Sequence, residues 1–172
     1  MKTLFQTERL VVACAAETEI PKIIQLEEHP DNRNYLWIGT VEEHKDEIKD
    51  PNHILCVFKE KTDMGIIGYA LIRLNRSSNV LELRRIAIDK KGIGYGTEVM
   101  EKLFEYAFTK LNINRFWLDV YPDNNIGIKL YEKLGMHSDG VLRENYLSHR
   151  GYLDQIIYSM LKSEYDAKMN TK

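Results

Sequence analysis

Residues 91–97 read KGIGYGT and lie between an apolar segment, residues 80–88, and a segment with helical periodicity, residues 97–111. The glycines at positions 92, 94 and 96 allow a tight turn and a close approach of the backbone to a ligand, because no Cβ atom intervenes. The first turn of the predicted helix would direct its unpaired N–H groups, at the positive end of the helix dipole, toward the same place. Such a loop typically binds phosphate or pyrophosphate, with a glycine-rich connection that holds no ligand as the alternative.

Two common phosphate-binding motifs do not match this loop. A P-loop ends in Gly-Lys followed by Ser or Thr, whereas Gly96 is followed by Thr97 and Glu98. The dinucleotide-binding motif G-x-G-x-x-G needs its third glycine one residue further along the chain than Gly96. The loop is therefore expected to belong to another class of phosphate-binding site.

A second motif lies downstream, where residues 124–136 read NNIGIKLYEKLGM. In this order, the two motifs resemble the GNAT superfamily of acetyl-CoA-dependent N-acetyltransferases. The family's loop pattern, Q/R-x-x-G-x-G/A, corresponds here to Lys91, Gly94 and Gly96. Its second pattern, N-x-x-A-x-x-L-Y-E-K-L-G-F, corresponds here to Asn124, Gly127, Leu130, Tyr131, Gly135 and Met136.

The resemblance extends from about residue 80 to about residue 161, and more loosely to the sequence TERL at residues 7–10. The sequences GVLR at 140–143 and GYLD at 151–154 are similar to the branch that contains ribosomal-protein N-terminal and polyamine acetyltransferases. The chain also departs from the family pattern. Lys91 replaces the usual Gln or Arg, the loop before it is short, and Gly127 replaces an alanine.

The resemblance implies an α/β (α+β) GNAT-like fold, with a mixed, mostly antiparallel central sheet of about six to seven strands and helices on both faces. The residue pattern favours the same class, because strands in hairpins are followed by strands that alternate with helices. Helices are expected near residues 17–28 and 41–49, and strands at 9–13, 54–60, 66–74, 80–88, 115–121 and 152–161. A length of 172 residues is most economically a single acetyltransferase domain, residues 1–172, with a core at about 7–165.

The function that the resemblance implies is transfer of the acetyl group of acetyl-CoA directly to a primary amine, which is a small amine, a polyamine or a protein N-terminus. The alternative is a non-catalytic acyl-CoA-binding sensor or regulatory module. Carried over position by position, the expected acetyl-CoA-binding residues are Ile86, Ala87, Ile88, Lys91, Gly92, Ile93, Gly94, Tyr95, Gly96, Thr97, Asn124, Gly127 and Tyr131.

Two residues are expected to be catalytic. The family places a tyrosine at Tyr131 that faces the CoA sulfur, where a phenol with a pKa near 10 is a competent acid for the leaving thiolate. A core-packing role is the alternative. Glu82 is the expected general base, or else one half of an ion pair with Arg84 or Arg85. An amine that arrives deprotonated would need no base, and Asn124 has helix capping as an alternative role.

The acceptor side is expected to be acidic. Between residues 27 and 50 the sequence has many more acidic than basic residues, and in this family the N-terminal helices border the acceptor pocket. An acidic rim would concentrate cationic amines, while a solvated helix face is the commoner explanation of such a run. The aromatic residues that could line the same pocket are Tyr35, Trp37, Tyr146 and Tyr152.

The composition excludes several other classes. A net charge of −2 and a pI near 6.2 argue against nucleic acid as a partner, and no apolar run approaches the roughly 20 residues that span a membrane. The five histidines lack metal-ligand spacing, so no metal site is expected. Two cysteines are too few for a disulfide framework and are expected to be reduced. We therefore expect a cytoplasmic enzyme, with a homodimer as one possible assembly.

Overall fold

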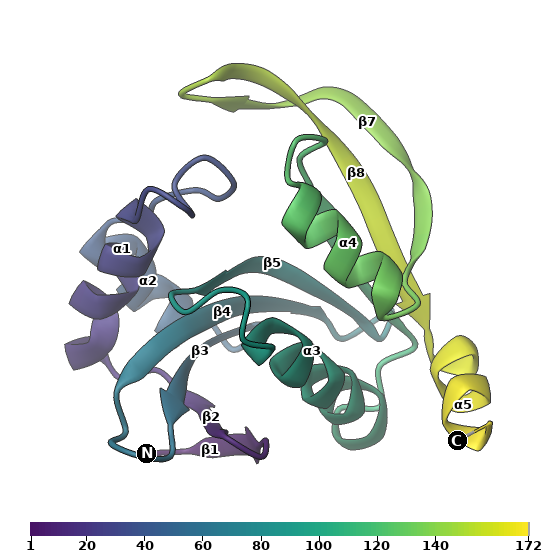
Figure 1. Ribbon diagram of the computed structural model, residues 1–172, viewed down its shortest axis with the longest axis horizontal. Coiled ribbons are helices and arrows are strands. Elements are labelled where there is room, and N and C mark those ends of the chain that lie inside the picture. The colour runs from purple at the N-terminus through teal and green to yellow at the C-terminus, as the bar shows by residue number, and fades with distance from the viewer. Residues whose placement is uncertain (172) are drawn as a thin grey trace.

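An eight-stranded mixed sheet runs through the computed structural model, which describes residues 1–171 (Figure 1). The strand order is β1-β2-β3-β4-β5-β6-β8-β7, and among the pairs formed by residues 1–171 only β5–β6 is parallel. The strands are β1 (Thr3–Gln6), β2 (Leu10–Cys14), β3 (His53–Glu60), β4 (Ile66–Asn75), β5 (Val80–Ile88), β6 (Arg115–Val120), β7 (His137–Ser148) and β8 (Gly151–Leu161). The α-helices are α1 (Ile20–Glu28), α2 (Val41–Lys49), α3 (Tyr95–Glu105), α4 (Asn125–Lys133) and α5 (Lys162–Asn170).

The predicted fold class, a mostly antiparallel mixed sheet with helices on both faces, is confirmed as an α+β fold. The sheet has more strands than expected, because β1 and β7 were not predicted. β1 has four residues, and β7 is exposed along most of its length, so neither shows the apolar alternation typical of a half-buried strand. Within residues 1–171, no helix is long and apolar enough to cross a membrane.

Alternation along the central strands divides the core between two faces. In β3, Cys56 and Phe58 pack in the cluster formed with α3, whereas Leu55 and Val57 pack in the cluster formed with α1. The same alternation continues in β4. The helices therefore cover opposite faces of one sheet, as the period-two pattern of the strands requires.

The helix after the glycine-rich loop differs from the sequence prediction. It begins at Tyr95, two residues earlier than expected, and its α-helical part ends at Glu105. A π-helical turn, Tyr106–Lys110, follows and keeps both Ala107 and Phe108 buried. The π turn adds a residue to one turn, and the periodicity in the sequence does not distinguish this from a regular helix.

A bulge at Arg84 changes which face of the sheet the end of β5 presents. Along the β4–β5 ladder, Ile72 pairs with Leu83 and Leu71 pairs with Arg85, so Arg84 has no partner of its own. Strict alternation would have put residues 82 and 85 on opposite faces. The extra residue places Arg85 on the face covered by α1 and α2, where Glu82 also lies.

A buried polar network ties α1 and α2 to this face of the sheet. Glu27 of α1 accepts hydrogen bonds from the Tyr69 hydroxyl and, at 2.8 Å, from the backbone N–H of Gly39. Arg85 lies 3.3 Å from Glu27 and also pairs with Glu47 of α2. The Glu27 carboxylate is thus satisfied although its side chain is fully buried.

His44 completes this network. Its Nδ1 is 2.8 Å from Glu47, its Nε2 is 3.2 Å from Glu27, and its side chain is fully buried. Burial alone would lower the pKa of His44, but the hydrogen bonds to Glu27 and Glu47 outweigh burial and raise it to about 9. At neutral pH two positive and two negative groups therefore balance one another, because Arg85 and His44 oppose Glu27 and Glu47.

The stability of the protein should therefore depend on pH above neutrality. The pKa of His44 is raised in the folded state from 6.5 to about 9, so its contribution is complete below pH 6.5 and is lost as the pH rises through 9. The free energy of unfolding should fall by on the order of 1–3 kcal/mol across this window. Urea unfolding at a series of pH values measures it.

Two variants distinguish His44 from other groups. His44→Gln should be less stable below pH 7 and should lose most of the fall in stability between pH 6.5 and 9. His53→Gln is the matched control, because His53 pairs with Asp50 at 2.8 Å in a more accessible position. An identical pH profile for the parent protein and His44→Gln would show that His44 does not hold the extra proton.

Candidate active site

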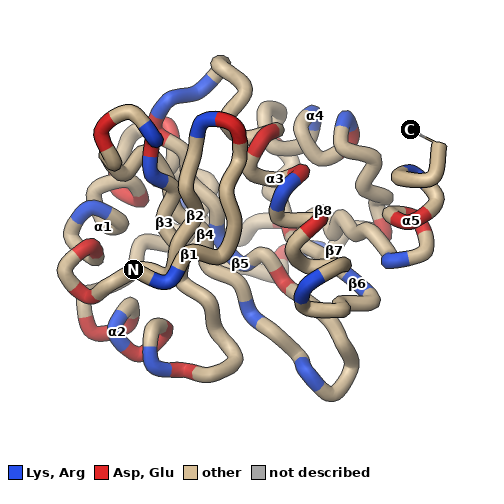
Figure 2. Tube along the Cα trace, turned by 90° about the horizontal axis from the view of Figure 1, so that it is seen from below, with Lys and Arg blue, Asp and Glu red and all other residues tan. Residues whose placement is uncertain are grey.

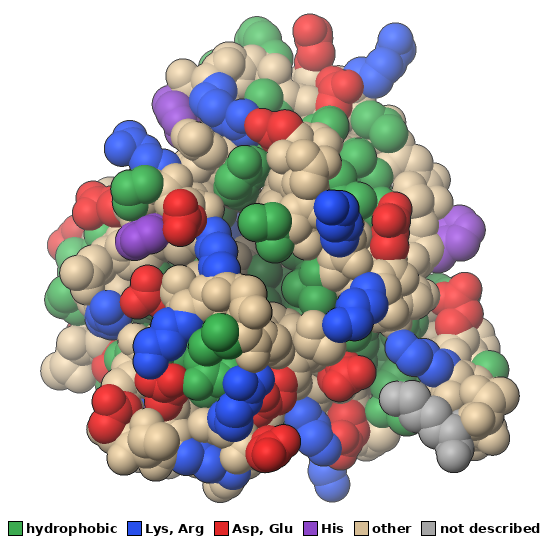
Figure 3. All heavy atoms as spheres, in the orientation of Figure 1, with side chains coloured by type: hydrophobic (Ala, Val, Ile, Leu, Met, Phe, Trp, Pro, Cys, Tyr) green, Lys and Arg blue, Asp and Glu red, His purple; other side chains and the backbone are tan. Residues whose placement is uncertain are grey.

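Strands β5 and β6 separate soon after they begin, and a cavity opens between them. Their parallel pairing covers Val80–Glu82 and Arg115–Trp117, whereas β5 continues to Ile88 and β6 to Val120. Beyond this point β6 stays paired with β8. The cavity has a volume of about 1330 Å³, and Figure 3 shows its opening as the hollow near the middle of this face. It is large enough for an elongated ligand.

The glycine-rich loop forms one end of the cavity. Gly92 and Gly94 have φ angles of 79° and 90°, in the left-handed region that favours glycine. Gly94 is the N-cap of α3, so the free N–H groups of the first turn follow it directly. A Cβ at Gly96 would lie 3.4 Å from Leu130 of α4, so the loop and α4 approach closely there. These features fit an anion-binding cradle.

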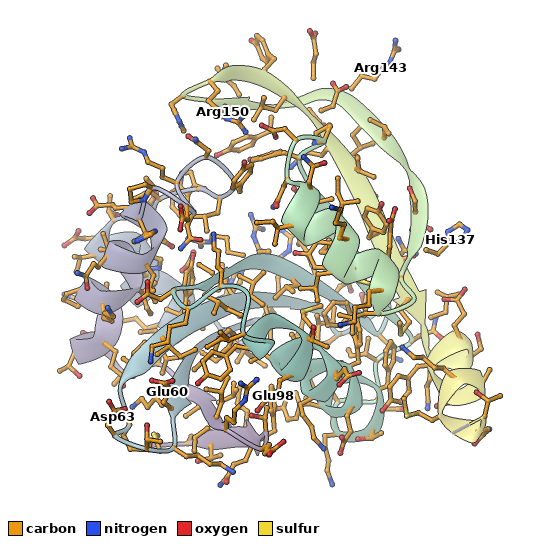
Figure 4. All side chains as sticks on the ribbon, in the orientation of Figure 1. Glu60, Asp63, Glu98, His137, Arg143 and Arg150 are labelled. Carbon is orange, nitrogen blue, oxygen red and sulfur yellow. The ribbon has the colours of Figure 1, made fainter. Side chains whose placement is uncertain are left out.

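The segment before β2 braces this loop from outside. Arg9 forms an ion pair with Glu98 of α3 at 2.7 Å and donates a hydrogen bond to the carbonyl of Ile93 at 3.0 Å. Thr7 also hydrogen-bonds to Glu98, which Figure 4 labels beside the start of α3. The guanidinium of Arg9 lies 4.3 Å from the ring centre of Tyr95. The TERL sequence thus has a physical role, since it fixes the loop.

Lys91 faces the opposite wall of the cavity. Its Nζ donates a hydrogen bond to the carbonyl of Asp31 at 2.7 Å. Burial lowers the pKa of Lys91, and the nearby Asp31 partly opposes this effect. The lysine therefore connects the glycine-rich loop to the segment between α1 and α2, a contact that the sequence did not predict.

Asn124 caps α4, and its contact explains a departure from the family pattern. Its side-chain oxygen accepts a hydrogen bond from the N–H of Gly127 at 3.0 Å, which confirms the capping alternative. A Cβ at Gly127 would lie 3.0–3.1 Å from three atoms of the Asn124 side chain. An alanine at position 127 would crowd this cap.

Tyr131 lies on the inner side of α4. It is 6% exposed, lines the cavity, and packs against the ring of Tyr158 with 6.1 Å between the ring centres. Burial raises the pKa of Tyr131, and the charge of Asp119 raises it further. The phenol is therefore protonated at neutral pH.

Glu82 lies where β5 and β6 part, and 8% of the residue is exposed. Its Oε2 is 2.6 Å from Arg73 of β4 and 4.0 Å from Arg84, but neither contact has hydrogen-bond geometry. Within residues 1–171, Oε2 is a buried side-chain oxygen without a hydrogen-bond partner. Arg85, one of its two expected partners, pairs with Glu27 and Glu47 instead.

Asp119 of β6 is a candidate that the sequence prediction missed. It lines the same cavity, and its carboxylate accepts a hydrogen bond from Gln155 at 2.7 Å. Burial raises the pKa of Asp119, and the negative charge of Glu82 adds to the shift. The alternation of β6, in which Phe116, Leu118 and Val120 are buried, places Asp119 on the other face. An acidic residue within this mostly apolar strand was the signal in the sequence that could have identified Asp119 as a site residue.

The far wall of the cavity comes from α2 and the segment before it. Trp37 and Tyr35 line this wall. Tyr146 of β7 also lines the cavity, whereas Tyr152 is 65% exposed and lies outside the cavity lining. Trp37 stacks on Arg85, with the guanidinium carbon 4.7 Å from the ring centre.

The predicted acidic rim is smaller than the sequence suggested. Acidic and basic residues alternate along α2 (Figure 2), and Glu43, Asp46 and Glu47 line the cavity. Glu27 is buried instead. Glu47 is paired with Arg85, and Glu43 accepts the hydrogen bonds of Thr40 at the start of the helix. Within residues 1–171, Asp46 is the carboxylate of these three whose side chain makes no ion pair or hydrogen bond.

The turn between β7 and β8 lies against the wall that α2 and the segment before it form. Arg150 donates hydrogen bonds to Asp123 at 2.6 Å and to the carbonyl of Asn34 at 2.7 Å (Figure 4). Its guanidinium also lies 5.7 Å from the ring centre of Tyr35 and 5.8 Å from that of Tyr121. One side chain thus joins both walls of the cavity.

Most of the predicted site residues meet at this cavity although they come from β5, the loop, α3 and α4. The predicted residues that line the cavity are Glu82, Ile86, Ala87, Ile88, Lys91, Gly92, Gly94, Tyr95, Gly96, Asn124, Gly127 and Tyr131. Ile93 and Thr97 are not part of the lining. Ile93 is 49% exposed, and its carbonyl is held by Arg9.

Comparison with known proteins identifies the family. The sequence profile of the acetyltransferase (GNAT) family matches residues 15–136, which is most of the chain. The chain belongs to the GNAT family. It is an N-acetyltransferase that uses acetyl-CoA, as predicted, and the alternative of a non-catalytic sensor is set aside.

Several GNAT proteins are similar to this one over long stretches. The uncharacterized N-acetyltransferase p20 of Bacillus licheniformis is 28% identical over 96% of this chain and 99% of its own length. Spermidine N(1)-acetyltransferase of Vibrio cholerae is 29% identical over 62% of each chain. A crystal structure of a Vibrio cholerae spermidine N-acetyltransferase in complex with CoA and spermine has a TM-score of 0.81 at 22% identity, covering 91% of this chain and 98% of that one. This last likeness shows the shared fold.

We expect Gly94→Val to weaken acetyl-CoA binding by at least about tenfold. Valine at a φ of 90° is strained, and its side chain would approach Arg9, whose Nη2 is 3.4 Å from the Cβ position. Gly140→Val is the control for lost backbone freedom, because Gly140 has a φ of 149° and lies outside the cavity lining. Calorimetric titration measures both affinities. Equal affinity for Gly94→Val and the parent protein would rule out this loop as the binding site.

Proposed function

We propose that this enzyme transfers the acetyl group of acetyl-CoA directly to a cationic primary amine that enters from the α2 side of the cavity. The observation that carries the proposal is the position of three groups on one cavity. The Tyr131 phenol lies on the α4 side, and the carboxylates of Glu82 and Asp119 lie where β5 and β6 part. Acid and base candidates thus face a common space next to the glycine-rich loop.

The cofactor half of the proposal assigns acetyl-CoA to the loop and to the edge of β5. The loop backbone and the first turn of α3 would hold the pyrophosphate, because the N–H groups of a helix's first turn have no partner within the helix. Past Glu82, β5 has lost β6 as its neighbour. The backbone at Ile86, Ala87 and Ile88 would then bind the amide groups of the pantetheine arm, in the manner of an added strand.

The two carboxylates would prepare the amine. An ammonium group cannot attack a thioester, so it must first lose a proton. Burial raises the pKa of Asp119, with a further contribution from Glu82, and a carboxylate with a raised pKa is a stronger base. We assign proton acceptance to this pair, with Asp119 added to the predicted Glu82. Glu82, the other member of this pair, also contacts Arg73 and Arg84.

Tyr131 would act on the other side of the reacting carbon. When the tetrahedral intermediate collapses, the CoA thiolate leaves and needs a proton. The pKa of Tyr131 is raised by burial, so the phenol is fully protonated at neutral pH.

Two observations support a cationic acceptor. The α2 side of the cavity presents Asp46 as a carboxylate without an ion pair among residues 1–171, next to Glu43 and the paired Glu47. In addition, relatives of this chain include spermidine N(1)-acetyltransferases from Vibrio cholerae and Escherichia coli, at 29% and 28% identity. Polyamines carry several positive charges on a slender chain. Such an acceptor fits the carboxylates on the α2 side of the cavity and the substrate named for these relatives.

Tyr131→Phe should lower kcat by at least about tenfold, about 1.4 kcal/mol of activation free energy, and leave acetyl-CoA affinity nearly unchanged. The hydroxyl contributes when the thiolate leaves, whereas the ring packing is kept. Tyr158→Phe is the matched control, because the ring of Tyr158 packs against that of Tyr131 but its hydroxyl hydrogen-bonds to Glu132 at 3.0 Å. Thiol release from acetyl-CoA measures both. A kcat within about twofold of the parent protein would exclude Tyr131 as the acid.

An amine panel tests the acceptor. Spermidine and putrescine should have higher kcat/KM values than butylamine, and this advantage should shrink as salt rises, because exposed charges are screened over about 8 Å at physiological ionic strength. Asp46→Asn should raise the KM for spermidine about two- to fivefold and leave the KM for butylamine unchanged. Glu42→Gln is the control, because Glu42 is on the same helix but not in the cavity lining. A higher kcat/KM for butylamine than for spermidine and putrescine would overturn the cationic assignment.

A further inference from the structure

The two cysteines of the chain lie directly opposite each other on neighbouring strands. They are the only cysteines in the sequence. Cys14 ends β2, Cys56 lies in β3, and the antiparallel β2–β3 ladder pairs them. Both are free thiols, and the proposed acetyl transfer uses neither.

The hydrogen bonds around the pair identify its geometry. The N–H of Ala15 donates to the carbonyl of Leu55 at 2.9 Å, so the next pair along the ladder is hydrogen-bonded between β2 and β3. The N–H of Cys14 instead points to β1 and donates to the carbonyl of Lys2 at 2.9 Å. Cys14 and Cys56 therefore occupy a non-hydrogen-bonded position, where Cα atoms are about 4.5 Å apart and the side chains are closest. Disulfides need Cα atoms about 4.4–6.8 Å apart.

Both sulfurs also lie on the same face of the sheet. Directly opposed residues of an antiparallel pair point to one side, and Cys56 belongs to the core cluster on the α3 side. Tyr106 packs on that cluster, and its pKa is raised by burial with smaller contributions from Cys14 and from Cys56. One phenol thus lies near both thiols, as a shared face requires.

We propose that Cys14 and Cys56 are a reversible dithiol–disulfide site that a mild two-electron oxidant closes. The bond would join the two ends of residues 15–55, the segment that carries α1, α2 and the wall of the cavity with Trp37 and Asp46. It would form within one chain and would need no change of strand register.

The two thiols have different roles in the reaction. Cys14 is partly accessible, whereas Cys56 is buried, its thiol lies 3.6 Å from the carbonyl of Ala70, and burial raises its pKa to about 12. Cys14 is therefore the thiol that meets a hydroperoxide, which oxidises it to a sulfenic acid and is itself reduced to the alcohol or, for hydrogen peroxide, to water. The Cys56 sulfur then attacks the Cys14 sulfur, the S–S bond forms, and the hydroxyl of the sulfenic acid leaves with the Cys56 proton as water. A thiol reductant reverses the change by thiol–disulfide exchange.

The experiment treats the folded, reduced protein with hydrogen peroxide at low protein concentration. Free thiols are then counted after denaturation, and peptides are mapped by mass spectrometry. We expect both thiols to disappear together, the intact mass to fall by two hydrogen atoms, and one linked peptide pair to contain Cys14 and Cys56. Dithiothreitol should restore both thiols. Dimers linked through Cys14, or oxygen added to Cys14 while Cys56 still titrates, would overturn the proposal.

A second measurement tests whether the native register accepts the bond. A cross-link between residues 14 and 56 restricts the unfolded chain, so the melting temperature of the oxidised protein should be about 5–15 °C higher than that of the reduced protein. Cys14→Ser is the matched control, because it leaves Cys56 in place and should show no rise after the same treatment. A cross-linked protein that melts at or below the temperature of the reduced protein would contradict an unstrained site.

Discussion

The functional architecture of this protein depends on the short parallel pairing of β5 and β6. Three residue pairs hold the two strands together, and then β5 turns toward the glycine-rich loop while β6 stays with β8. Strand edges inside a protein normally pair with other strands, because unpaired backbone groups are costly to bury. Here the separation leaves a cavity lined by backbone and by both strands. The glycine-rich loop, the two carboxylates and Tyr131 all lie around the cavity that this divergence opens.

One extra residue in β5 decides the chemistry of the cavity wall. The bulge at Arg84 turns Arg85 toward α1 and α2, where it meets Glu27 and Glu47. His44 and Tyr69 complete a balanced buried network, and the carboxylates that α2 contributes are therefore partly neutralised. Such buried pairs are strongly destabilising to break, since each partner would be left as an unpaired charge. The network thus holds α1 and α2 against the sheet and pairs Glu47, which leaves Glu43 and Asp46 as the α2 carboxylates of the cavity lining without an ion pair among residues 1–171.

Sequence and structure agree best where a motif has its own local geometry. The loop glycines, the Asn124 cap and the bounds of α2 follow from backbone conformation and capping within a few residues, and they were predicted. The beginning of α3 was predicted less well, because Gly94 caps it two residues earlier, and the π turn after Glu105 has no periodicity signal. Among the partners of Glu82, Arg84 was expected but Arg73 was not, because cross-strand register brings Arg73 to it.

The sequence by itself determined the family, the fold class and most of the residues that line the cavity on the side of the glycine-rich loop and α4. These depend on glycine conformation, strand alternation and the spacing of the α4 motif, all of which act over short distances along the chain. Only the tertiary structure decided that Asp119 joins Glu82, that Glu27 is buried rather than part of an acidic rim, and that Cys14 faces Cys56. Asp119 and the cysteine pair depend on strand register, where a shift by one residue would turn a side chain to the opposite face. Glu27 depends on the one-residue bulge that brings Arg85 to it.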